Sequence, residues 1–224
     1  MLTEIIPPIN QKHQTFCLYN YLKYSTHYKL KDFTQEIIIQ KNEYLYKPPF
    51  EHNYIYEVLD GAINLGSYTD QGDEYVHDVV SQKDFFGNLK YLNNQFFEFS
   101  KTITSTRLRV YNRSFFKQII INEPTIAEWF ISYLVKRWCA SEKKMRKVNE
   151  RNSVEKLRFL RTYFNKEISD IEGNDHILYD LLTQKDLGDL VGATRQTIAS
   201  ALKKSSVITG YYAWLKHSIF RFKL

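Results

Sequence analysis

The hydrophobic positions of residues 36–117 come in short runs rich in β-branched and aromatic residues, and polar turn residues separate the runs. Such runs are typical of β-strands, and pairs such as Asp60-Gly61 and Phe86-Gly87 are typical of the turns between them. Many short strands at close spacing predict an antiparallel sandwich or barrel. The expected strands cover residues 37–39, 44–46, 54–58, 63–65, 75–80, 101–106 and 108–111.

Residues 124–149 have a different hydrophobic pattern, whose repeat alternates between four and three residues. Pro124 suits the first turn of a helix, and the repeat is a heptad seam that the small polar Ser141 breaks once. A seam on a long helix between two domains favours a dimer; packing of the helix on its own barrel is the alternative. The seam residues are Ile131, Leu134, Trp138, Met145 and Val148, with Ala127 one step earlier.

Residues 182–204 predict two short helices joined by a tight turn. Thr183 is a good N-cap, with Asp186 three residues on as a capping-box partner. Gly188 is small where the second helix passes close, and Gly192 stands where the first helix stops, a position that favours positive φ. Thr194 caps the second helix. The apolar positions at helical spacing are Leu187, Leu190, Val191, Ile198, Ala201 and Leu202.

The outward face of the second helix carries polar and basic residues that suit the donor and acceptor pattern of the DNA major groove. This combination predicts a helix-turn-helix. An ordinary helical hairpin in another kind of core is the alternative. The outward residues are Arg195, Gln196, Thr197, Ser200, Lys203 and Lys204.

The segments around these features are less informative. Residues 1–35 resemble a helical lead-in, residues 154–164 predict a further helix, and residues 170–175 predict a polar loop. Two short strands at residues 207–212 and 218–222 would form a β-hairpin wing, either closing the core or reaching a phosphate through Lys216 and His217.

The formal net charge of +6 is unevenly spread. Residues 1–135 hold 13 Lys and Arg against 15 Asp and Glu, which gives −2, whereas residues 136–224 hold 18 against 10, which gives +8. The basic surplus therefore accompanies the helix-turn-helix, as phosphate binding requires.

Composition narrows the setting. The chain has no run of 18 apolar residues and no basic, apolar leader, so we expect neither a membrane span nor a secretory signal. Cys17 and Cys139 lie far apart in the sequence and have no metal-type spacing. A cytoplasmic protein with reduced thiols is the plain expectation.

The order of barrel, long helix, helix-turn-helix and hairpin resembles the Crp/Fnr family of bacterial transcription regulators. The resemblance extends from about residue 30 to 222 and rests on Tyr56-x-Val-Leu-Asp-Gly61, Gly72, the Asp84-Phe-Phe-Gly-Asn-Leu89 segment and residues 182–204. It implies a homodimer that binds a two-fold symmetric site on double-stranded DNA and recruits or blocks RNA polymerase.

The resemblance also implies an α+β fold. An N-terminal antiparallel β-roll (a double-stranded β-helix like the cyclic-nucleotide-binding domain) would occupy residues 1–123 as an effector-type domain. A dimerisation helix would cover residues 124–149, and a winged helix-turn-helix DNA-binding domain residues 150–224.

The effector pocket departs from the family pattern. Members that bind cyclic AMP have a glutamate after the cassette glycine and an arginine further along, whereas Asn88 follows Gly87 here and residues 89–100 contain no arginine. A glutamate among phenylalanines would repel a phosphate, so cyclic AMP is not expected to bind and the effector is open. Two isolated cysteines cannot hold an iron–sulfur centre; haem stays open through histidines or cysteines. The pocket residues are Gly87, Asn88, Leu89, Phe96, Phe97 and Glu98.

The family's recognition pattern Arg-Glu-x-x-x-Arg becomes Arg195-Gln196-x-x-x-Ser200. Arg195 would read guanine, Gln196 would favour adenine, and Ser200 would weaken the contact at its base step. The expected phosphate contacts are Thr183, Gln184, Thr194, Thr197, Lys203 and Lys204.

Two other classes of function are compatible with a barrel. A barrel-type ligand sensor or interaction module without specific DNA binding is the main alternative. An enzyme of the cupin type would need a cluster of metal-binding histidines and a carboxylate, but the barrel offers only His52 and His77, with Glu74 nearby. We therefore expect no enzyme activity, no metal site and no bound cofactor.

Overall fold

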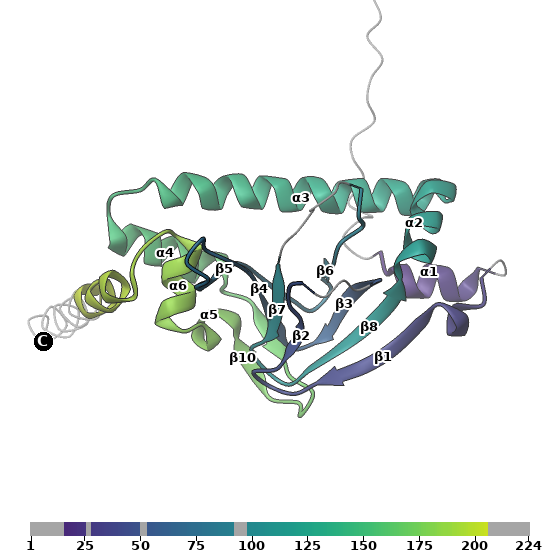
Figure 1. Ribbon diagram of the computed structural model, residues 1–224, viewed down its shortest axis with the longest axis horizontal. Coiled ribbons are helices and arrows are strands. Elements are labelled where there is room, and N and C mark those ends of the chain that lie inside the picture. Colours follow the sequence, from purple (N-terminus) through teal and green to yellow (C-terminus); the bar gives the residue numbers. More distant parts are fainter. Residues whose placement is uncertain (1–15, 26–27, 50–52, 92–97, 206–224) are drawn as a thin grey trace, which may run out of the picture.

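The computed structural model describes residues 16–25, 28–49, 53–91 and 98–205. A β-roll is followed by one long helix that runs along it, and a small mainly helical unit packs at the far end (Figure 1). This is the α+β architecture that the sequence predicted. The predicted wing at residues 207–212 and 218–222 lies outside the described residues.

The β-roll consists of two four-stranded antiparallel sheets. Their strand orders are β1-β8-β3-β6 and β2-β7-β4-β5, and side chains such as Val58, Ile63 and Leu108 fill the space between them. Gly61, which joins β3 to β4, has φ +89°, and a Cβ there would lie 2.5 Å from the Thr106 hydroxyl oxygen. The strands are β1 (Thr34–Ile39), β2 (Tyr44–Tyr46), β3 (Tyr54–Asp60), β4 (Ala62–Tyr68), β5 (Glu74–Ser81), β6 (Phe85–Phe86), β7 (Phe99–Thr102) and β8 (Thr106–Asn112).

One predicted strand is shorter than expected. The run at residues 101–106 was predicted to be continuous, but β7 ends at Thr102 and β8 begins at Thr106. The Thr104 hydroxyl accepts a hydrogen bond from the Ala62 amide at 3.2 Å, and the Thr106 hydroxyl donates to the Thr104 carbonyl at 2.8 Å. Threonine side chains thus bind main-chain groups of the turns, and the chain bends between the two strands.

Three short helices, two before the strands of the roll and one after them, contribute to a second hydrophobic core. They are α1 (Leu18–Tyr24), the 3₁₀ helix η2 (Leu30–Asp32) and α2 (Arg113–Asn122). Helix α2 was not predicted from the sequence, because residues 36–117 were assigned to strands. The N-cap of α2 is Asn112, whose side chain accepts a hydrogen bond from the Phe115 amide. Buried Phe115, Phe116 and Ile119 follow at helical spacing.

The long helix α3 (Pro124–Val148) has two apolar stripes. One stripe, which includes Ile126, Trp129 and Phe130, is buried in the core that α3 shares with α1 and α2. The other is the predicted seam, whose side chains are 41–68% exposed in the single chain. The seam residues are Ile131, Leu134, Trp138, Met145 and Val148.

The C-terminal unit follows α3 and begins with α4 (Ser153–Tyr163). Residues 170–174 form the turn of a two-stranded hairpin, so the predicted polar loop is shorter than expected and Asp175 already belongs to a strand. The other elements are β9 (Glu167–Ser169), β10 (Asp175–Ile177), α5 (Leu178–Leu181), α6 (Gln184–Leu190) and a helix over residues 195–205.

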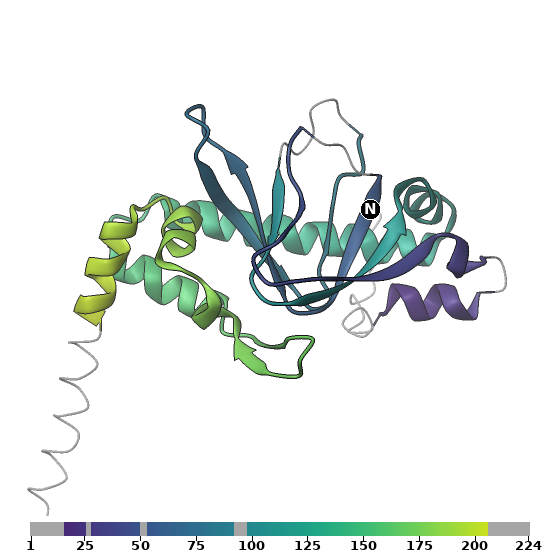
Figure 2. The same ribbon diagram turned by 60° about the horizontal axis from the view of Figure 1, so that its bottom comes forward.

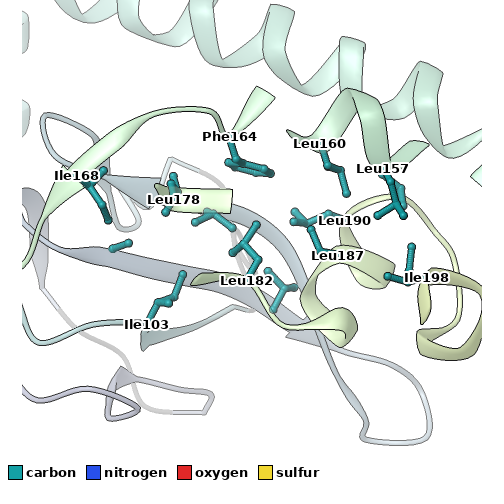
Figure 3. Packing of buried hydrophobic residues seen from close by; sticks show 14 of the residues in the cluster. Ile103, Leu157, Leu160, Phe164, Ile168, Leu178, Leu182, Leu187, Leu190 and Ile198 are labelled. Carbon is teal, nitrogen blue, oxygen red and sulfur yellow. The ribbon is translucent and has the colours of Figure 1, made fainter. Parts of the chain in front are cut away.

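The C-terminal unit packs directly on the β-roll. One continuous hydrophobic core joins Val76 and Val79 of the roll to the C-terminal unit. The same core contains Ile103 of the roll and Leu178 and Leu187 of the C-terminal unit (Figure 3). Both ribbon views place α4, α6 and the helix of residues 195–205 at the end of the molecule opposite α1 (Figure 2). Within the described residues, every helix is too short or too polar to cross a membrane.

Candidate DNA-binding surface and barrel cavity

The first helix of the predicted helix-turn-helix is α6, and a reciprocal capping box holds its N-terminus. The Thr183 hydroxyl accepts from the Asp186 amide at 3.1 Å, and the Asp186 carboxylate accepts from the Thr183 amide at 2.8 Å. The sequence prediction of this capping box is confirmed. Thr183 and the neighbouring Gln184 are exposed.

The turn after α6 depends on two glycines. Gly192 has φ +60°, in the left-handed region that the sequence predicted. A Cβ on Gly188 would lie 2.4 Å from the Ala193 carbonyl oxygen, so only glycine lets the chain pass this close. The two helices can therefore cross at short distance.

The second helix covers residues 195–205 and carries the predicted DNA-contacting residues. The Thr194 hydroxyl accepts from the Thr197 amide at 3.1 Å and caps the helix. Ile198 and Ala201 are buried against the core. All nine predicted contact residues are exposed: Arg195, Gln196 and Ser200 for bases, and Thr183, Gln184, Thr194, Thr197, Lys203 and Lys204 for phosphates.

A cavity of about 440 Å³ lies between the β-roll and α3, and most of its lining is apolar or aromatic. Three of the predicted pocket residues, Gly87, Leu89 and Glu98, line it. Asn88 does not, and its side chain instead accepts a hydrogen bond from the Lys90 amide at 2.6 Å. Phe96 and Phe97 lie outside the described residues.

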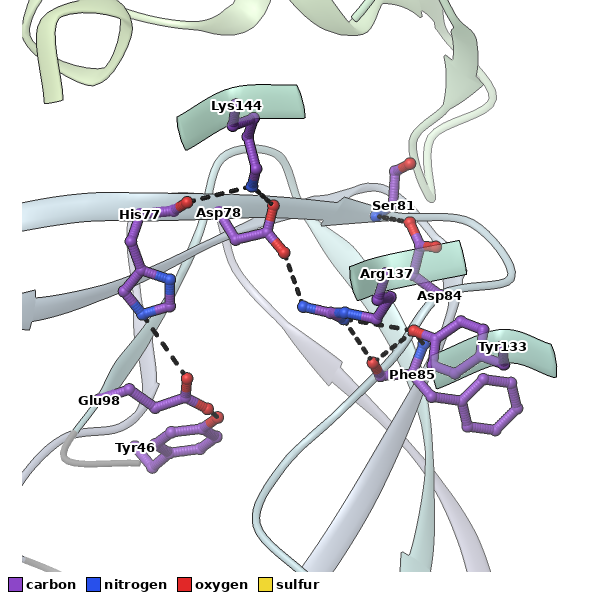
Figure 4. Close-up of polar contacts among 10 residues, drawn as sticks. All are labelled: Tyr46, His77, Asp78, Ser81, Asp84, Phe85, Glu98, Tyr133, Arg137 and Lys144. Carbon is purple, nitrogen blue, oxygen red and sulfur yellow. Dashed lines mark hydrogen bonds and ion pairs between the residues drawn. The ribbon is translucent and has the colours of Figure 1, made fainter. Parts of the chain in front are cut away.

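Glu98 places a carboxyl group in the wall of this cavity. Its Oε1 accepts from the Tyr46 hydroxyl at 2.7 Å, and its Oε2 lies 3.8 Å from Nε2 of His77 (Figure 4). Burial raises the pKa of Glu98 and lowers the pKa of His77. Both shifts disfavour the charged forms of these two side chains, so both weaken an ion pair between them.

Two cations of α3 line the same cavity, and both bind Asp78 of β5. Arg137 and Lys144 each approach a carboxylate oxygen of Asp78 to 2.6 Å. Arg137 also donates to the Phe85 carbonyl at 3.0 Å, and Lys144 donates to the His77 carbonyl at 3.2 Å (Figure 4). The network joins α3 to β5 and β6.

Sequence reasoning missed this network. Arg137 and Lys144 are seven residues apart, so they lie on one face of a helix, but the heptad pattern drew attention to the apolar seam instead. Two basic residues at that spacing away from the seam are the signal that could have revealed the network. Asp78 had no comparable signal, because nothing local marks the partner of a distant ion pair.

The described residues hold no group of three or more His, Cys, Asp or Glu side chains placed to bind a metal ion. Of the residues considered for a cupin-type site, His52 lies outside the described ranges. Glu74 instead accepts hydrogen bonds from the Tyr44 hydroxyl at 2.8 Å.

Comparison with known proteins finds solved structures that share this fold. No family model and no curated protein matches the sequence. FixK2 from Bradyrhizobium japonicum superposes with a TM-score of 0.64 at 17% identity, over 79% of this chain and 86% of that one. The c-di-GMP responsive global regulator CLP from Xanthomonas campestris gives 0.62 at 16% identity, over 80% and 90%.

A third solved structure carries the family designation itself. A transcriptional regulator of the CRP/FNR family from Thermus thermophilus superposes with a TM-score of 0.58 at 16% identity, over 77% of this chain and 86% of that one. At such identities the likeness concerns the arrangement of the elements. The chain therefore has the fold of the Crp/Fnr regulators, as its sequence resemblance predicted.

Proposed function

We propose that this protein is a transcription regulator that binds a two-fold symmetric DNA site as a homodimer. The observation that carries the proposal is the exposed face of residues 195–205, mounted on a capped and glycine-turned helix pair. Arg195 can donate to O6 and N7 of guanine, and Gln196 can bind adenine through N6 and N7. Ser200 gives a weaker contact at its base step.

Charge and fold support the same proposal. The surplus of +8 in residues 136–224 suits a phosphate-binding surface, to which Thr183, Gln184, Thr194, Thr197, Lys203 and Lys204 would contribute. Residues 1–123 would form the effector-type domain, residues 124–149 the dimerisation helix and residues 150–224 the DNA-binding domain. RNA polymerase is the partner that this arrangement implies.

Selection of bound DNA from a random library tests the proposal, with the purified full-length protein and no added ligand. A recovered two-fold symmetric motif with a guanine in each half supports regulation, dimerisation and the role of Arg195 together. Recovery of no motif, with only weak and salt-sensitive binding, would favour a barrel-type sensor or interaction module. The cavity between the β-roll and α3 is the observation that favours this second candidate function, because it could hold a ligand.

Replacing Arg195 with alanine is expected to weaken binding to the selected site by about 1–3 kcal/mol and to relax one base position, because a bidentate contact to guanine is lost. Titration of labelled site variants measures both effects. Arg161→Ala, an exposed α4 change of equal charge, is the control and should leave the base preference unchanged. Unaltered preference in Arg195→Ala would remove this assignment.

Cyclic AMP is expected to give no saturable heat in a calorimetric titration at micromolar concentration. The Glu98 carboxyl group occupies the cavity wall, and both cations of α3 already bind Asp78. A phosphate would have to displace one of these pairs and approach a carboxylate. A clear, saturable signal above the heat of dilution would contradict this expectation and restore cyclic AMP as the effector.

A further inference from the structure

A buried lysine stands where three segments of the chain meet. Lys156 lies at the end of the first turn of α4 and is only 7% exposed. Its ammonium group donates to the Val148 carbonyl at 2.8 Å and to the Val191 carbonyl at 2.8 Å. Val148 is the last residue of α3, and Val191 follows α6 in the helix-turn-helix. One side chain therefore binds the ends of two helices from the start of a third.

The two hydrogen bonds of Lys156 suit a positively charged donor. Carbonyl groups at the C-terminal end of a helix lack donors within the helix and carry the negative end of its dipole. The ammonium group of Lys156 supplies charge-assisted hydrogen bonds to carbonyls at two such ends at once. A neutral side chain of similar length would fill the space but would leave these carbonyls without this donor.

A second contact links the turn after α6 to the end of α3. Gly192, the turn residue after Val191, would bring a Cβ to 3.0 Å from Cγ1 of Val148. The turn of the helix-turn-helix thus lies directly against the last residue of α3. Only two residues separate Gly192 from the helix of residues 195–205. The direction of this helix therefore depends on how the turn packs against α3.

We propose that Lys156 is a positioning residue that fixes the direction of the DNA-facing helix relative to α3. The inference rests on the proposed function, because in a dimer paired through α3 this direction sets the distance between the two DNA-facing helices. Those helices must lie about one DNA turn apart, or roughly 34–36 Å, and successive base pairs are only about 3.4 Å apart. Lys156 itself is buried, so it acts through the turn and not by touching DNA.

The test uses DNA with two copies of the selected half-site at the selected spacing, or one or two base pairs closer or farther. The wild-type protein should prefer the selected spacing by about tenfold or more. Lys156→Met should reduce that preference to about threefold or less, with the same base preference within a half-site. Lys143→Met removes the same charge from an exposed position on α3 and should keep the wild-type spacing preference.

Lys156→Met that retained the wild-type spacing preference would overturn the proposal, because a residue needed only for stability would behave in this way. Lys156→Arg retains a cation and should restore part of the preference. If Lys156→Met does not fold, Lys156→Leu, which also lacks a donor, replaces it in both assays and is judged by the same criteria.

A measurement without DNA separates this proposal from the proposed function. Spin labels on Cys139, which is exposed on α3, and on Ser200→Cys report the direction of the helix in a Cys17→Ser background. One labelled subunit per dimer is obtained by dilution into label-free protein. The label-to-label distance distribution should be narrow with Lys156 and broader with Lys156→Met, which has no donor for the two carbonyls. Equal widths would overturn the positioning role even if DNA selection succeeded, and failed DNA selection would leave this readout intact.

Discussion

A full-length variant carrying Ile131→Glu and Met145→Glu is expected to be monomeric at micromolar concentration and to lose high-affinity binding to a two-fold symmetric site. Both side chains belong to the exposed seam of α3, and neither lines the cavity or the roll-facing core. In a paired seam, each glutamate would be buried without a partner. Such burial costs about 3 kcal/mol or more, which is roughly a hundredfold or greater loss of affinity between subunits.

Analytical ultracentrifugation measures the first effect, and titration of the selected DNA site measures the second. Lys143→Gln is the control, because it also lowers the net charge by one unit per change at an exposed position of α3 outside the seam. The control should remain dimeric. If the wild-type protein is itself a strict monomer in the centrifuge, the seam does not serve dimerisation, and α3 only packs on its own barrel.

The second large effect is expected on stability. Asp78→Ala should lower the free energy of unfolding by about 3 kcal/mol, because it leaves two cations of α3 without their shared counter-ion. The Lys144 side chain is only 10% exposed, so water cannot fully replace the lost carboxylate. The expected loss is at the lower end for broken buried pairs because the Arg137 side chain is 33% exposed. Urea unfolding at fixed protein concentration measures the loss.

Asp60→Ala provides the matched control for this prediction. Asp60 pairs with Arg107 at 2.6 Å, and its side chain is 21% exposed, close to the 18% of Asp78. Arg107, however, is 47% exposed, so it stays solvated after its partner is removed. The expected cost is below about 1 kcal/mol. Equal losses in the two variants would show that the Asp78 network does not hold α3 to the roll.

The helix-turn-helix was the part of the fold most open to prediction from sequence. Its determinants are local: Thr183 and Asp186 are three residues apart, and Gly192 and Thr194 act within a single turn. Local backbone rules therefore placed both helices and their exposed faces correctly. The strands were predicted for a similar reason, since each short run and its turn can be recognised without its partners.

Contacts between distant segments were not predictable in this way. Lys156 appears as an ordinary helical lysine in the sequence, and its acceptors lie eight and 35 residues away. Asp78 and Arg137 are 59 residues apart. The cavity was predicted only in part. Gly87 and Leu89 belong to a recognisable segment, whereas the wall contributed by α3 depends on how that helix packs against the roll.

The contact between α6 and β5 bears on whether the C-terminal unit could be exchanged for that of another chain with this fold. β5 ends its sheet, and its Val76 amide donates to the Asp189 carboxylate of α6 at 3.0 Å. A free strand edge invites pairing with other chains, so α6 shields part of this one. A foreign DNA-binding unit grafted onto this barrel would need an acceptor in place of Asp189 and an apolar face toward Val79. In this chain, β5 and the α6 helix that covers it would therefore have to be exchanged together.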